Sequence, residues 1–498
     1  MNDAKQEFNH EATLCIIGAG AAGLTIAKKL GTKVKNIILL ESGGIEYDHA
    51  TQSLYKGKVS GIPYFPLESV RLRYFGGSTN HWGGQSIPME PYDFKLKPWV
   101  KDSGWPIKYK EIERYLGEAV DVCGIPAGSF EWEEWSKKSG KGAYPLHTAI
   151  FKEALLRFSS PAKRFGIYYK KYIENSENIK CILNANVLCL CADESGKSIG
   201  AVNVSTVDKK RKVKIKADYF VLACGGIENS RLLLLSDDVH KKGIGNTHDM
   251  VGRYFMEHPN YDSGEIRVNE SVKKGILGKP FYKVNGGLHR VDFKLRNDIQ
   301  EKEKILNHTA FFVDDSMDQH GTLNKQGFFS KAWKKVKAKL FQGDNDWRFK
   351  LRVRLEHAPY SESRIVLSDE LDSLGQRRAR LNMYFGELEA RTIEKVQQMF
   401  AVELGRLGLG RMKIEFDPIK NPEWKKNVGW QYHHCGGTRM SNNPETGVVD
   451  VDCKVHGVDN LYIAGSSVFP SSGHANPTLN LVALALRLSD KLSSIILK

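Results

Sequence analysis

Residues 13–30 read TLCIIGAGAAGLTIAKKL, and this stretch decides the fold. An apolar run of strand length leads into a turn in which Gly18, Gly20 and Gly23 have the spacing G-x-G-x-x-G, and apolar residues at helical spacing follow. Glycine permits a tight turn and the close approach of backbone N–H groups to a pyrophosphate, which the N-terminus of the following helix also stabilises. The stretch therefore predicts a strand–turn–helix unit that binds a dinucleotide.

A second strand completes the unit. Residues 34–44, VKNIILLESGG, form an apolar run that ends at Glu41. A carboxylate about 20 residues after the glycines accepts hydrogen bonds from ribose hydroxyls and repels a 2′-phosphate. Glu41 therefore favours FAD or NAD over NADP. A glycine-rich turn without a ligand is the alternative, but it leaves the register of strand, glycines, helix and acid unexplained.

Length and composition set broad limits. With 498 residues, of which 41% are apolar and 10% aromatic, the chain can build two cores, so we expect a large two-domain protein. No apolar stretch reaches the ~20 residues that a spanning helix needs. The charge of +15 favours anionic partners, although the widely spread lysines are equally compatible with a solubilising role. The eight scattered cysteines and the absence of an export leader lead us to expect a cytoplasmic protein.

Several segments organise the rest of the chain. Residues 74–85, YFGGSTNHWGGQ, lack a helical or strand period, and such long irregular segments are usually functional. Residues 146–158, LHTAIFKEALLRF, predict an amphipathic helix, and residues 179–193 predict consecutive strands. Residues 217–236 predict a buried strand, a Gly-Gly turn and a helix. From residue 261 the pattern becomes more charged, which indicates a separate substrate-facing domain.

These motifs together carry a family resemblance. GAGAAG, RYFGGSTNHWGGQ, ACGGIENSRLLL, GRYFMEHP, HHCGGTRM and residues 460–492 resemble the glucose-methanol-choline oxidoreductases, in particular the bacterial sugar dehydrogenase and pyranose oxidase branch. The resemblance implies an α/β fold with a Rossmann-like FAD-binding domain and an α+β, sheet-containing substrate-binding domain. We expect the FAD-binding domain over 1–100, 145–260 and 428–498, a helical connection over 101–144, and the substrate-binding domain over 261–427.

The resemblance also implies FAD as the redox cofactor. Its ADP half would lie on the glycine turn, and its ring beneath the C-terminal motif and the 74–85 loop. The expected cofactor-binding residues are Gly18, Gly20, Ala21, Ala22, Gly23, Glu41, Ser42, Gly76, Gly77, Ser78, Asn80, His81, Trp82, Gly83, Gly84, Val187, Ala223, Gly225, Gly465, Ser466, Pro477 and Thr478. His81 lies where pyranose oxidases carry a covalent histidyl link to the flavin, and both a covalent link and simple packing of His81 and Trp82 against the ring remain open.

Alcohol oxidation needs a base for the hydroxyl proton, and a neutral histidine is suited to this. His433, the first residue of HHCGGTRM, matches the active-site histidine of the family, and His434 should point elsewhere. A purely structural histidine pair is the alternative. A metal site on His433, His434 and Cys435 lacks the ligand spacing of tetrahedral sites, so we expect no metal.

Asn476, in GHANPT, matches the second active-site position of the family, which is either histidine or asparagine. Its uncharged amide can bind the substrate oxygen. Pro477 follows at the predicted first turn of a helix, so Asn476 could instead act as a helix cap. His474, two residues earlier, is expected to be either a residue at the rim of the site or a reserve candidate for the second active-site position.

We therefore predict an FAD-dependent dehydrogenase or oxidase that acts on the CH–OH group of a sugar, glycoside, polyol or other alcohol. A non-redox lyase resembling hydroxynitrile lyases is the alternative, and a flavin-binding protein without catalysis ranks last. The chain has no C-x-x-C-H haem motif, so the acceptor would be oxygen, a quinone, a carrier or a separate haem subunit. Co-export with a signal-bearing partner would place the protein in the periplasm instead of the cytoplasm.

A last segment stands apart from this function. Residues 328–341, FFSKAWKKVKAKLF, predict a lysine-rich amphipathic helix that could contact an anionic membrane or a partner protein. Ordinary domain surfaces carry similar helices, since lysine stems also cover apolar surface. We expect no nucleic-acid partner.

Overall fold

The computed structural model describes residues 2–3, 10–140, 144–275, 277–278, 281–284, 287–313 and 348–498. The predicted basic helix 328–341 lies outside the described residues. The α-helices are α1 Ala21–Leu30, α2 His49–Ser53, α3 Lys110–Cys123, α4 Trp132–Ser139, α5 Phe165–Glu174, α6 Gly226–Leu235, α7 Glu270–Lys274, α8 Asn297–Glu303, α10 Glu387–Arg406 and α11 Pro477–Ile496. The 3₁₀-helices are η1 Gly77–Asn80, η2 Pro91–Phe94, η3 Pro422–Asn427 and η4 Ser466–Val468.

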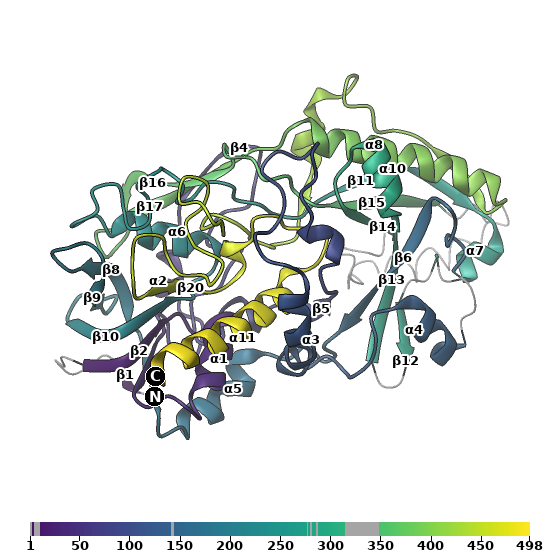
Figure 1. Cartoon of the computed structure of the whole chain (residues 1–498). Coiled ribbons are helices and arrows are strands. Elements are labelled where there is room, and N and C mark those ends of the chain that lie inside the picture. Colours follow the sequence, from purple (N-terminus) through teal and green to yellow (C-terminus); the bar gives the residue numbers. More distant parts are fainter. Residues whose placement is uncertain are drawn as a thin grey trace.

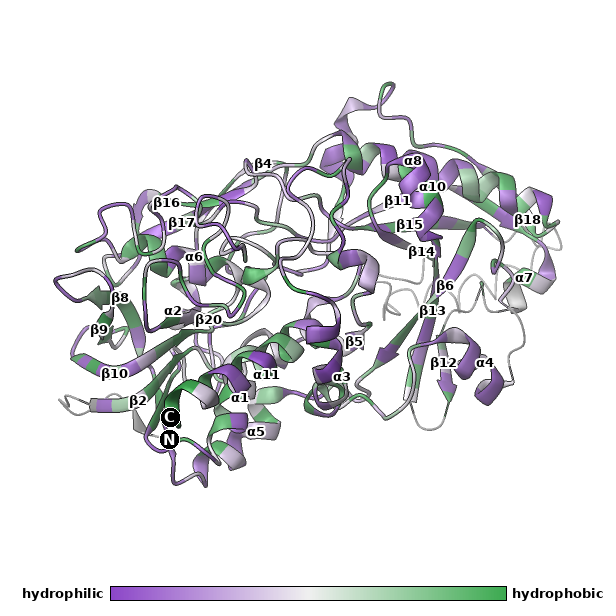
Figure 2. Ribbon diagram, in the orientation of Figure 1, coloured by the Kyte–Doolittle hydropathy of each residue, from purple (hydrophilic) through white to green (hydrophobic). Residues whose placement is uncertain are grey.

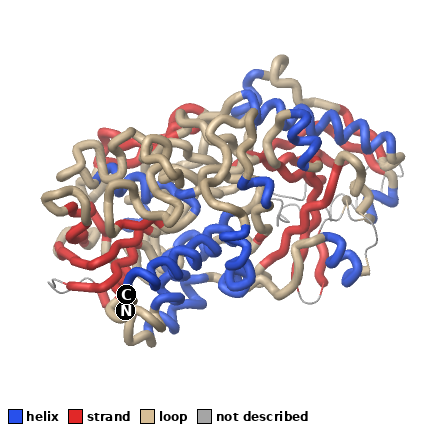
Figure 3. The backbone as a smooth tube through the Cα atoms, in the orientation of Figure 1, coloured by secondary structure: helices blue, strands red, loops and turns tan. Residues whose placement is uncertain are grey.

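The strands form three sheets, and two of them lie toward opposite ends of the molecule with loops between them (Figures 1 and 3). The strands are β1 Asn2–Asp3, β2 His10–Ile17, β3 Ile37–Leu40, β4 Lys58–Gly61, β5 Gln85–Ser86, β6 Phe151–Phe158, β7 Ile179–Leu183, β8 Asn186–Ala192, β9 Ile199–Ser205, β10 Lys212–Leu222, β11 Pro259–Val268, β12 Phe281–Val284, β13 Gly287–Leu295, β14 His308–Val313, β15 Arg348–Leu355, β16 Arg364–Leu371, β17 Arg377–Met383, β18 Gly410–Lys413, β19 Gly429–Trp430 and β20 Leu461–Ile463.

The eight-stranded sheet has the order β1-β7-β3-β2-β10-β9-β8, and β20 pairs with β10. Strands β7, β3, β2, β10 and β20 run parallel to their neighbours in this part of the sheet. The predicted strand–turn–helix–strand unit is present as β2, the glycine turn, α1 and β3. The strands expected in 179–193 and 217–236 are also present. Helix α1 packs on β2 and β3, and α11 packs on α1, in one hydrophobic core that contains Leu24 and Leu479. Both helices carry hydrophobic stretches, drawn green in Figure 2.

Parallel strands deliver residues to one edge of this sheet. Strands β2, β3, β10 and β20 are followed directly by Gly18, Glu41, Ala223 and Ala464. In open α/β sheets, ligands bind in the crevice outside the carboxyl ends of the strands. All four residues line one cavity, described below.

The nine-stranded sheet is antiparallel, with the order β18-β11-β15-β14-β13-β6-β5, and β12 and β19 pair with β13 and β11. The long helix α10 packs on one face, where Phe400 contacts Phe151, Phe293 and Phe312. The third sheet has the order β16-β17-β4. Among the described helices, none has the length and apolar character that a membrane span requires.

The helix predicted over 146–158 is wrong, because residues Phe151–Phe158 form β6 and pair with β13. Phe151 and Leu155 face the core under α10, whereas Ala154 and Leu156 belong to the core of the other sheet. With apolar residues on both faces, the strand loses its period of two, so its pattern resembled a helix. This strand also lies in a range that we assigned to the FAD-binding domain, yet it belongs to the nine-stranded sheet.

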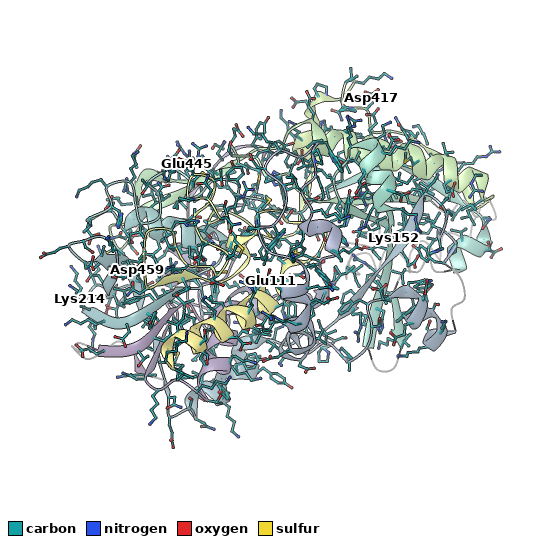
Figure 4. The ribbon with its side chains drawn as sticks, in the orientation of Figure 1. Glu111, Lys152, Lys214, Asp417, Glu445 and Asp459 are labelled. Atoms are coloured by element: carbon teal, nitrogen blue, oxygen red, sulfur yellow. The ribbon has the colours of Figure 1, made fainter. Side chains whose placement is uncertain are left out.

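Helix α11 is tied to the connection before β6. Arg487 of α11 donates to Glu111 at the start of α3, which Figure 4 labels beside α11. Tyr115 of α3 donates to Asp490 of α11 at 3.0 Å. The two predicted helical segments therefore pack side by side.

Candidate active site

A cavity of about 620 Å³ extends from the glycine turn after β2 to the C-terminal residues His433 and Asn476. Its volume lies in the range of about 300–1,000 Å³ that is usual for ligand sites. The lining comes from the ends of the parallel strands, the 74–85 loop, α6 and the N-terminus of α11. Sequence segments more than 400 residues apart thus form one site.

The glycine turn has the tight, closely packed backbone that the G-x-G-x-x-G spacing predicted. Gly18 has φ +106°, a conformation that favours glycine. A Cβ atom on Gly23 would lie 1.9 Å from the Gly18 carbonyl oxygen, so Gly23 permits close packing of the helix on the strand. Gly20 differs, because a Cβ there would meet nothing within 4 Å.

Three further glycines share the open surroundings of Gly20. A Cβ on Gly83, Gly225 or Gly465 would also meet nothing within 4 Å, and all four glycines line the cavity. At four separate turns, therefore, backbone atoms without a side chain face the cavity. A cradle of this kind fits a large dinucleotide whose phosphates approach backbone N–H groups at the start of α1.

Glu41 occupies the predicted place after β3 and is 6% exposed. One carboxylate oxygen accepts from the Ala19 N–H at 3.0 Å, and the other accepts from the Gly43 N–H at 2.9 Å. These bonds hold the carboxylate at the cavity wall, where its remaining lone pairs can accept from ribose hydroxyls.

Most of the predicted cofactor-binding residues meet at this cavity. The lining includes Gly18, Gly20, Ala21, Ala22, Glu41, Ser42, Gly77, Ser78, His81, Trp82, Gly83, Gly84, Val187, Ala223, Gly225, Gly465, Ser466, Pro477 and Thr478. Gly23, Gly76 and Asn80 do not line it. Asn80 instead donates to the Phe75 carbonyl at 2.8 Å, inside the 74–85 loop.

His81 and Trp82 lie at the end of η1 and line the cavity together. Trp82 donates from Nε1 to the Lys163 carbonyl at 2.9 Å and packs edge-on against Phe165. His81 is exposed and adjoins the cavity. The covalent flavin link through His81 stays a prediction.

An ionic cluster that the sequence analysis missed lines the same cavity. Glu228 of α6 binds Arg231 at 2.8 Å, Arg71 at 3.0 Å and Arg73 at 3.3 Å. Burial opposes ionisation of this carboxyl, but the three guanidiniums lower the pKa of Glu228 to about 2. Glu228 and Arg231 both lie within the quoted segment 217–236, but Arg71 and Arg73 are brought to them only by the fold.

His433 and Asn476 meet at the other end of the cavity. The Asn476 Nδ2 lies 3.2 Å from the His433 Nε2, and Asn476 is 7% exposed. Asn476 is the N-cap residue of α11 but makes no capping hydrogen bond with its side chain, so capping alone does not explain it. The Asn476 Oδ1 is buried and has no hydrogen-bond partner among the described residues. An acceptor of this kind is costly to leave unpaired.

His258 is a residue of this site to which the sequence analysis gave no role, although its motif GRYFMEHP was recognised. Its Nδ1 lies 2.9 Å from the His433 Nδ1, and its Nε2 lies 2.9 Å from the Gly473 carbonyl oxygen. Burial lowers the pKa of His258 to about 4. The ring is therefore neutral at pH 7.

Glu257 fixes the backbone that carries His433. Its carboxylate accepts from the N–H groups of His258, Gln431, Tyr432 and His433 at distances between 2.6 and 3.0 Å. Burial raises the pKa of Glu257 to about 7, against the effect of these four donors. One buried carboxyl group thus sets the position of the turn that presents the histidine.

The two neighbouring histidines point elsewhere. His434 binds the Tyr64 hydroxyl through Nε2 at 2.8 Å, and burial lowers the pKa of His434 to about 3. His474 was expected at the rim, and this is wrong: it is 1% exposed and its Nδ1 accepts from Asn307 at 3.0 Å. Neither ring is hydrogen-bonded to Asn476.

Across the parts of the chain that the structure describes, no group of three or more His, Cys, Asp or Glu side chains could hold a metal ion. Cys435 is fully buried, and the pKa of its thiol is raised well above the usual value by burial. A buried thiol of this kind behaves as a small hydrophobic group.

Comparison with known proteins agrees with this site. Residues 359–485 match the family model described as GMC oxidoreductase, and this range contains both His433 and Asn476. The chain is 24% identical to the fructose dehydrogenase large subunit of Gluconobacter japonicus over 96% of this chain and 97% of that protein. It is also 24% identical to the 2-methyl-1,2-propanediol dehydrogenase of Mycolicibacterium austroafricanum, over 97% of this chain and 95% of that protein.

The fold is shared with solved structures. A formate oxidase matches with a TM-score of 0.63 and 16% identity, over 98% of this chain and 99% of that one. The family model, the relatives along the whole chain and the glycine-lined cavity agree with one another. Residues 359–485 match the GMC oxidoreductase family, and the chain is an FAD-dependent oxidoreductase that resembles this family along its whole length.

Proposed function

We propose that the protein oxidises a hydroxyl group of a sugar, glycoside, polyol or other alcohol, with His433 as the base and Asn476 as the residue that holds the substrate oxygen. Bound FAD supplies the acceptor for the hydride that leaves the substrate carbon. The observation that supports this proposal most directly is the contact between His433 Nε2 and the Asn476 amide at the cavity. The names of the two dehydrogenases described above support this substrate class.

A chain of hydrogen bonds supports the role of His433 as a base. The Gly473 carbonyl can only accept, so the Nε2 of His258 carries the proton of that neutral ring. The Nδ1 of His258 is then an acceptor, and the Nδ1 of His433 must donate to it. A neutral His433 that is protonated on Nδ1 has its lone pair on Nε2, at the atom that faces Asn476.

The Asn476 side chain lies next to this lone pair and can donate a hydrogen bond to it. In the free site its amide Nδ2 donates to the His433 Nε2. When a substrate hydroxyl enters, its proton passes to the His433 Nε2, and the Asn476 amide donates instead to the substrate oxygen. The amide has no charge of its own, so it orients the oxygen without competing for the proton.

Anaerobic addition of candidate sugars, glycosides and polyols to the holoenzyme tests the proposal. At least one of them is expected to bleach the absorbance of the oxidised flavin, and the keto or aldehyde product should form in a 1:1 ratio to flavin. Cleavage of a cyanohydrin with no bleaching by any alcohol would instead indicate the lyase reaction and reject the proposal.

Replacing His258 by leucine is expected to slow flavin reduction by about 10²–10⁴-fold, the range of a general base, because a histidine that carries its proton on the wrong nitrogen loses this contribution. Leucine cannot accept a hydrogen bond from the His433 Nδ1. The proton of the His433 ring can then move to Nε2, where it occupies the lone pair that the base needs. His258→Gln should lose less activity, because its amide oxygen can accept. The measurement is stopped-flow flavin reduction as a function of pH.

His308 is the matched control for this test. It is also fully buried, with a pKa lowered to about 3 by burial, but its ring contacts the Leu306 carbonyl and the Leu295 N–H and not His433. His308→Gln should therefore leave the rate near that of the wild type. A His258→Leu enzyme as fast as the His308→Gln enzyme would refute the proton assignment.

A further inference from the structure

Gln85 connects the nine-stranded sheet with the cavity. It belongs to β5, which pairs with β6 at one edge of this sheet. Among the described strands of the sheet, Gln85 alone lines the cavity that also contains His433 and Asn476. The sheet therefore contributes a residue with a primary amide to the site.

The side-chain amide of Gln85 is accessible. Gln85 is 9% exposed, and its amide makes no hydrogen bond with the part of the chain that the structure describes. Neither the amide nitrogen nor the amide oxygen is sealed from solvent, in contrast to the Asn476 Oδ1. A molecule in the cavity can therefore form hydrogen bonds with this amide.

A second, buried amide ties the chain after Gln85 to Asn476. The Oδ1 of Asn480, on α11, accepts from the Met89 N–H at 2.9 Å, and its Nδ2 donates to the Ile87 carbonyl at 3.3 Å. The same Nδ2 donates to the Asn476 carbonyl at 3.3 Å. Figure 1 shows β5 beside the N-terminal end of α11, where Asn476 is the N-cap residue.

Gln85 and Asn476 lie at the cavity ends of the two segments that Asn480 joins. Both line the cavity, whereas Ile87, Met89 and Asn480 do not. Ile87 is two residues from Gln85, about 7 Å along a strand, and Asn480 is four residues from Asn476, about 6 Å along a helix. The two segments therefore run side by side from the cavity wall, and Gln85 and Asn476 border the same end of the cavity.

Two amides at one end of the cavity match two hydroxyl groups. Asn476 lies beside the His433 Nε2 at 3.2 Å, so it is placed to hold the oxygen that loses its proton. Gln85 adds two N–H donors and a carbonyl oxygen, and a hydroxyl group can pair with either kind of atom because it both donates and accepts. An amide carries no charge, so it favours a hydroxyl group over a carboxylate or an ammonium group.

We propose that Gln85 binds a second hydroxyl group of the substrate, on the carbon next to the one that is oxidised. The enzyme then acts on vicinal diols, the arrangement found in sugars and polyols, and discriminates against alcohols with a single hydroxyl group. The inference rests on the proposed oxidation, because it concerns the substrate of the same site. His433 and Asn476 keep the roles described above, and Gln85 orients the neighbouring carbon.

Pairs of compounds that differ by one hydroxyl group test this substrate class. Glycerol, 1,2-propanediol and D-glucose are compared with 1,3-propanediol, 1-propanol and 2-deoxy-D-glucose by anaerobic flavin reduction of the holoenzyme. The best substrate of the alcohol screen and its deoxy analogues complete the set. In at least one pair the complete compound should reduce the flavin with an apparent second-order rate constant about 10- to 100-fold higher, because the deoxy compound leaves the Gln85 amide unpaired.

Variants of Gln85 assign the preference to one residue. Gln85→Met has a similar length without an amide, so the rate constant for the complete compound should fall to that of the deoxy compound. Gln85→Asn keeps the amide but withdraws it by one methylene group, and should also lose most of the preference. Gln398→Met is the control, because Gln398 of α10 binds Glu394 at 3.2 Å and does not line the cavity. It should keep the full preference.

Flavin content and the visible spectrum separate substrate binding from cofactor binding. Gln85→Met should keep stoichiometric flavin and the spectrum of the wild type. Loss of flavin or a shifted spectrum would show that Gln85 binds the cofactor, and would overturn the assignment. A preference that survives in Gln85→Met would overturn it as well.

The proposed oxidation fails separately. If alcohols bleach the flavin but the rate constants are equal within every pair, only the inference on Gln85 is lost. If no compound of the pairs or of the alcohol screen bleaches the flavin, the oxidation itself is rejected.

Discussion

Replacing His433 by asparagine is expected to lower the rate of anaerobic flavin reduction by about 10²–10⁴-fold, the usual contribution of a general base. Asparagine keeps a polar side chain of moderate size but cannot take up the hydroxyl proton. The wild-type rate should fall at acid pH, where a protonated histidine cannot act as a base, and His433→Asn should lose this pH dependence. Stopped-flow spectroscopy across the pH range measures both effects.

The control for His433→Asn is His456→Asn. His456 is also a histidine of the C-terminal region, but its Nε2 binds the Ser441 carbonyl and it does not line the cavity. Its replacement should leave both the rate and the pH dependence unchanged. Flavin content should stay stoichiometric in both variants, because neither side chain belongs to the glycine turn. An asparagine variant at position 433 with the wild-type rate would disprove the base assignment.

Replacing Gly20 by valine is expected to weaken FAD binding by about 10- to 100-fold, since overpacking costs about 1–3 kcal/mol. Gly20 has φ −85°, which other residues adopt readily, and an added Cβ meets no protein atom within 4 Å. The side chain would therefore fill cavity space while the apoprotein keeps its fold. The ratio of flavin to protein after gel filtration, with the melting temperature of the apoprotein, measures the effect.

Two other glycines separate cofactor loss from misfolding. Gly117 of α3 is exposed, and a Cβ there also meets nothing within 4 Å, but it does not line the cavity. Gly117→Val should retain the flavin. Gly23→Ala should instead destabilise the apoprotein, because its Cβ would lie 1.9 Å from the Gly18 carbonyl. Full flavin occupancy in Gly20→Val would show that the cofactor phosphates do not approach this turn.

Local patterns predicted much of the cofactor side of the site. The glycine spacing at residues 18–23, the acid at Glu41 and the helix after Pro477 depend on residues that are near one another in the chain. Strand, turn and helix preferences act over such distances, so the sequence carries them directly. The resemblance to a family then assigned His433 and Asn476, whose contact the structure shows.

Other features escaped prediction because they depend on distant partners. The strand β6 is covered on both faces, and only the second face, supplied by another sheet, explains its apolar pattern. His258 acquires its role from Gly473 and His433, both more than 170 residues away. No local pattern distinguishes such a histidine from a buried structural one.

The amino-acid sequence by itself therefore determined the dinucleotide turn, the alternation of strands and helices around it, and the residue types available for alcohol oxidation. The tertiary structure alone decided that His258 and Asn476 meet His433 and that the carboxyl group of Glu257 holds the turn that carries it. The reason is physical: backbone preferences are set by neighbours in the chain, whereas proton positions and charge pairing are set by atoms within a few ångströms in space.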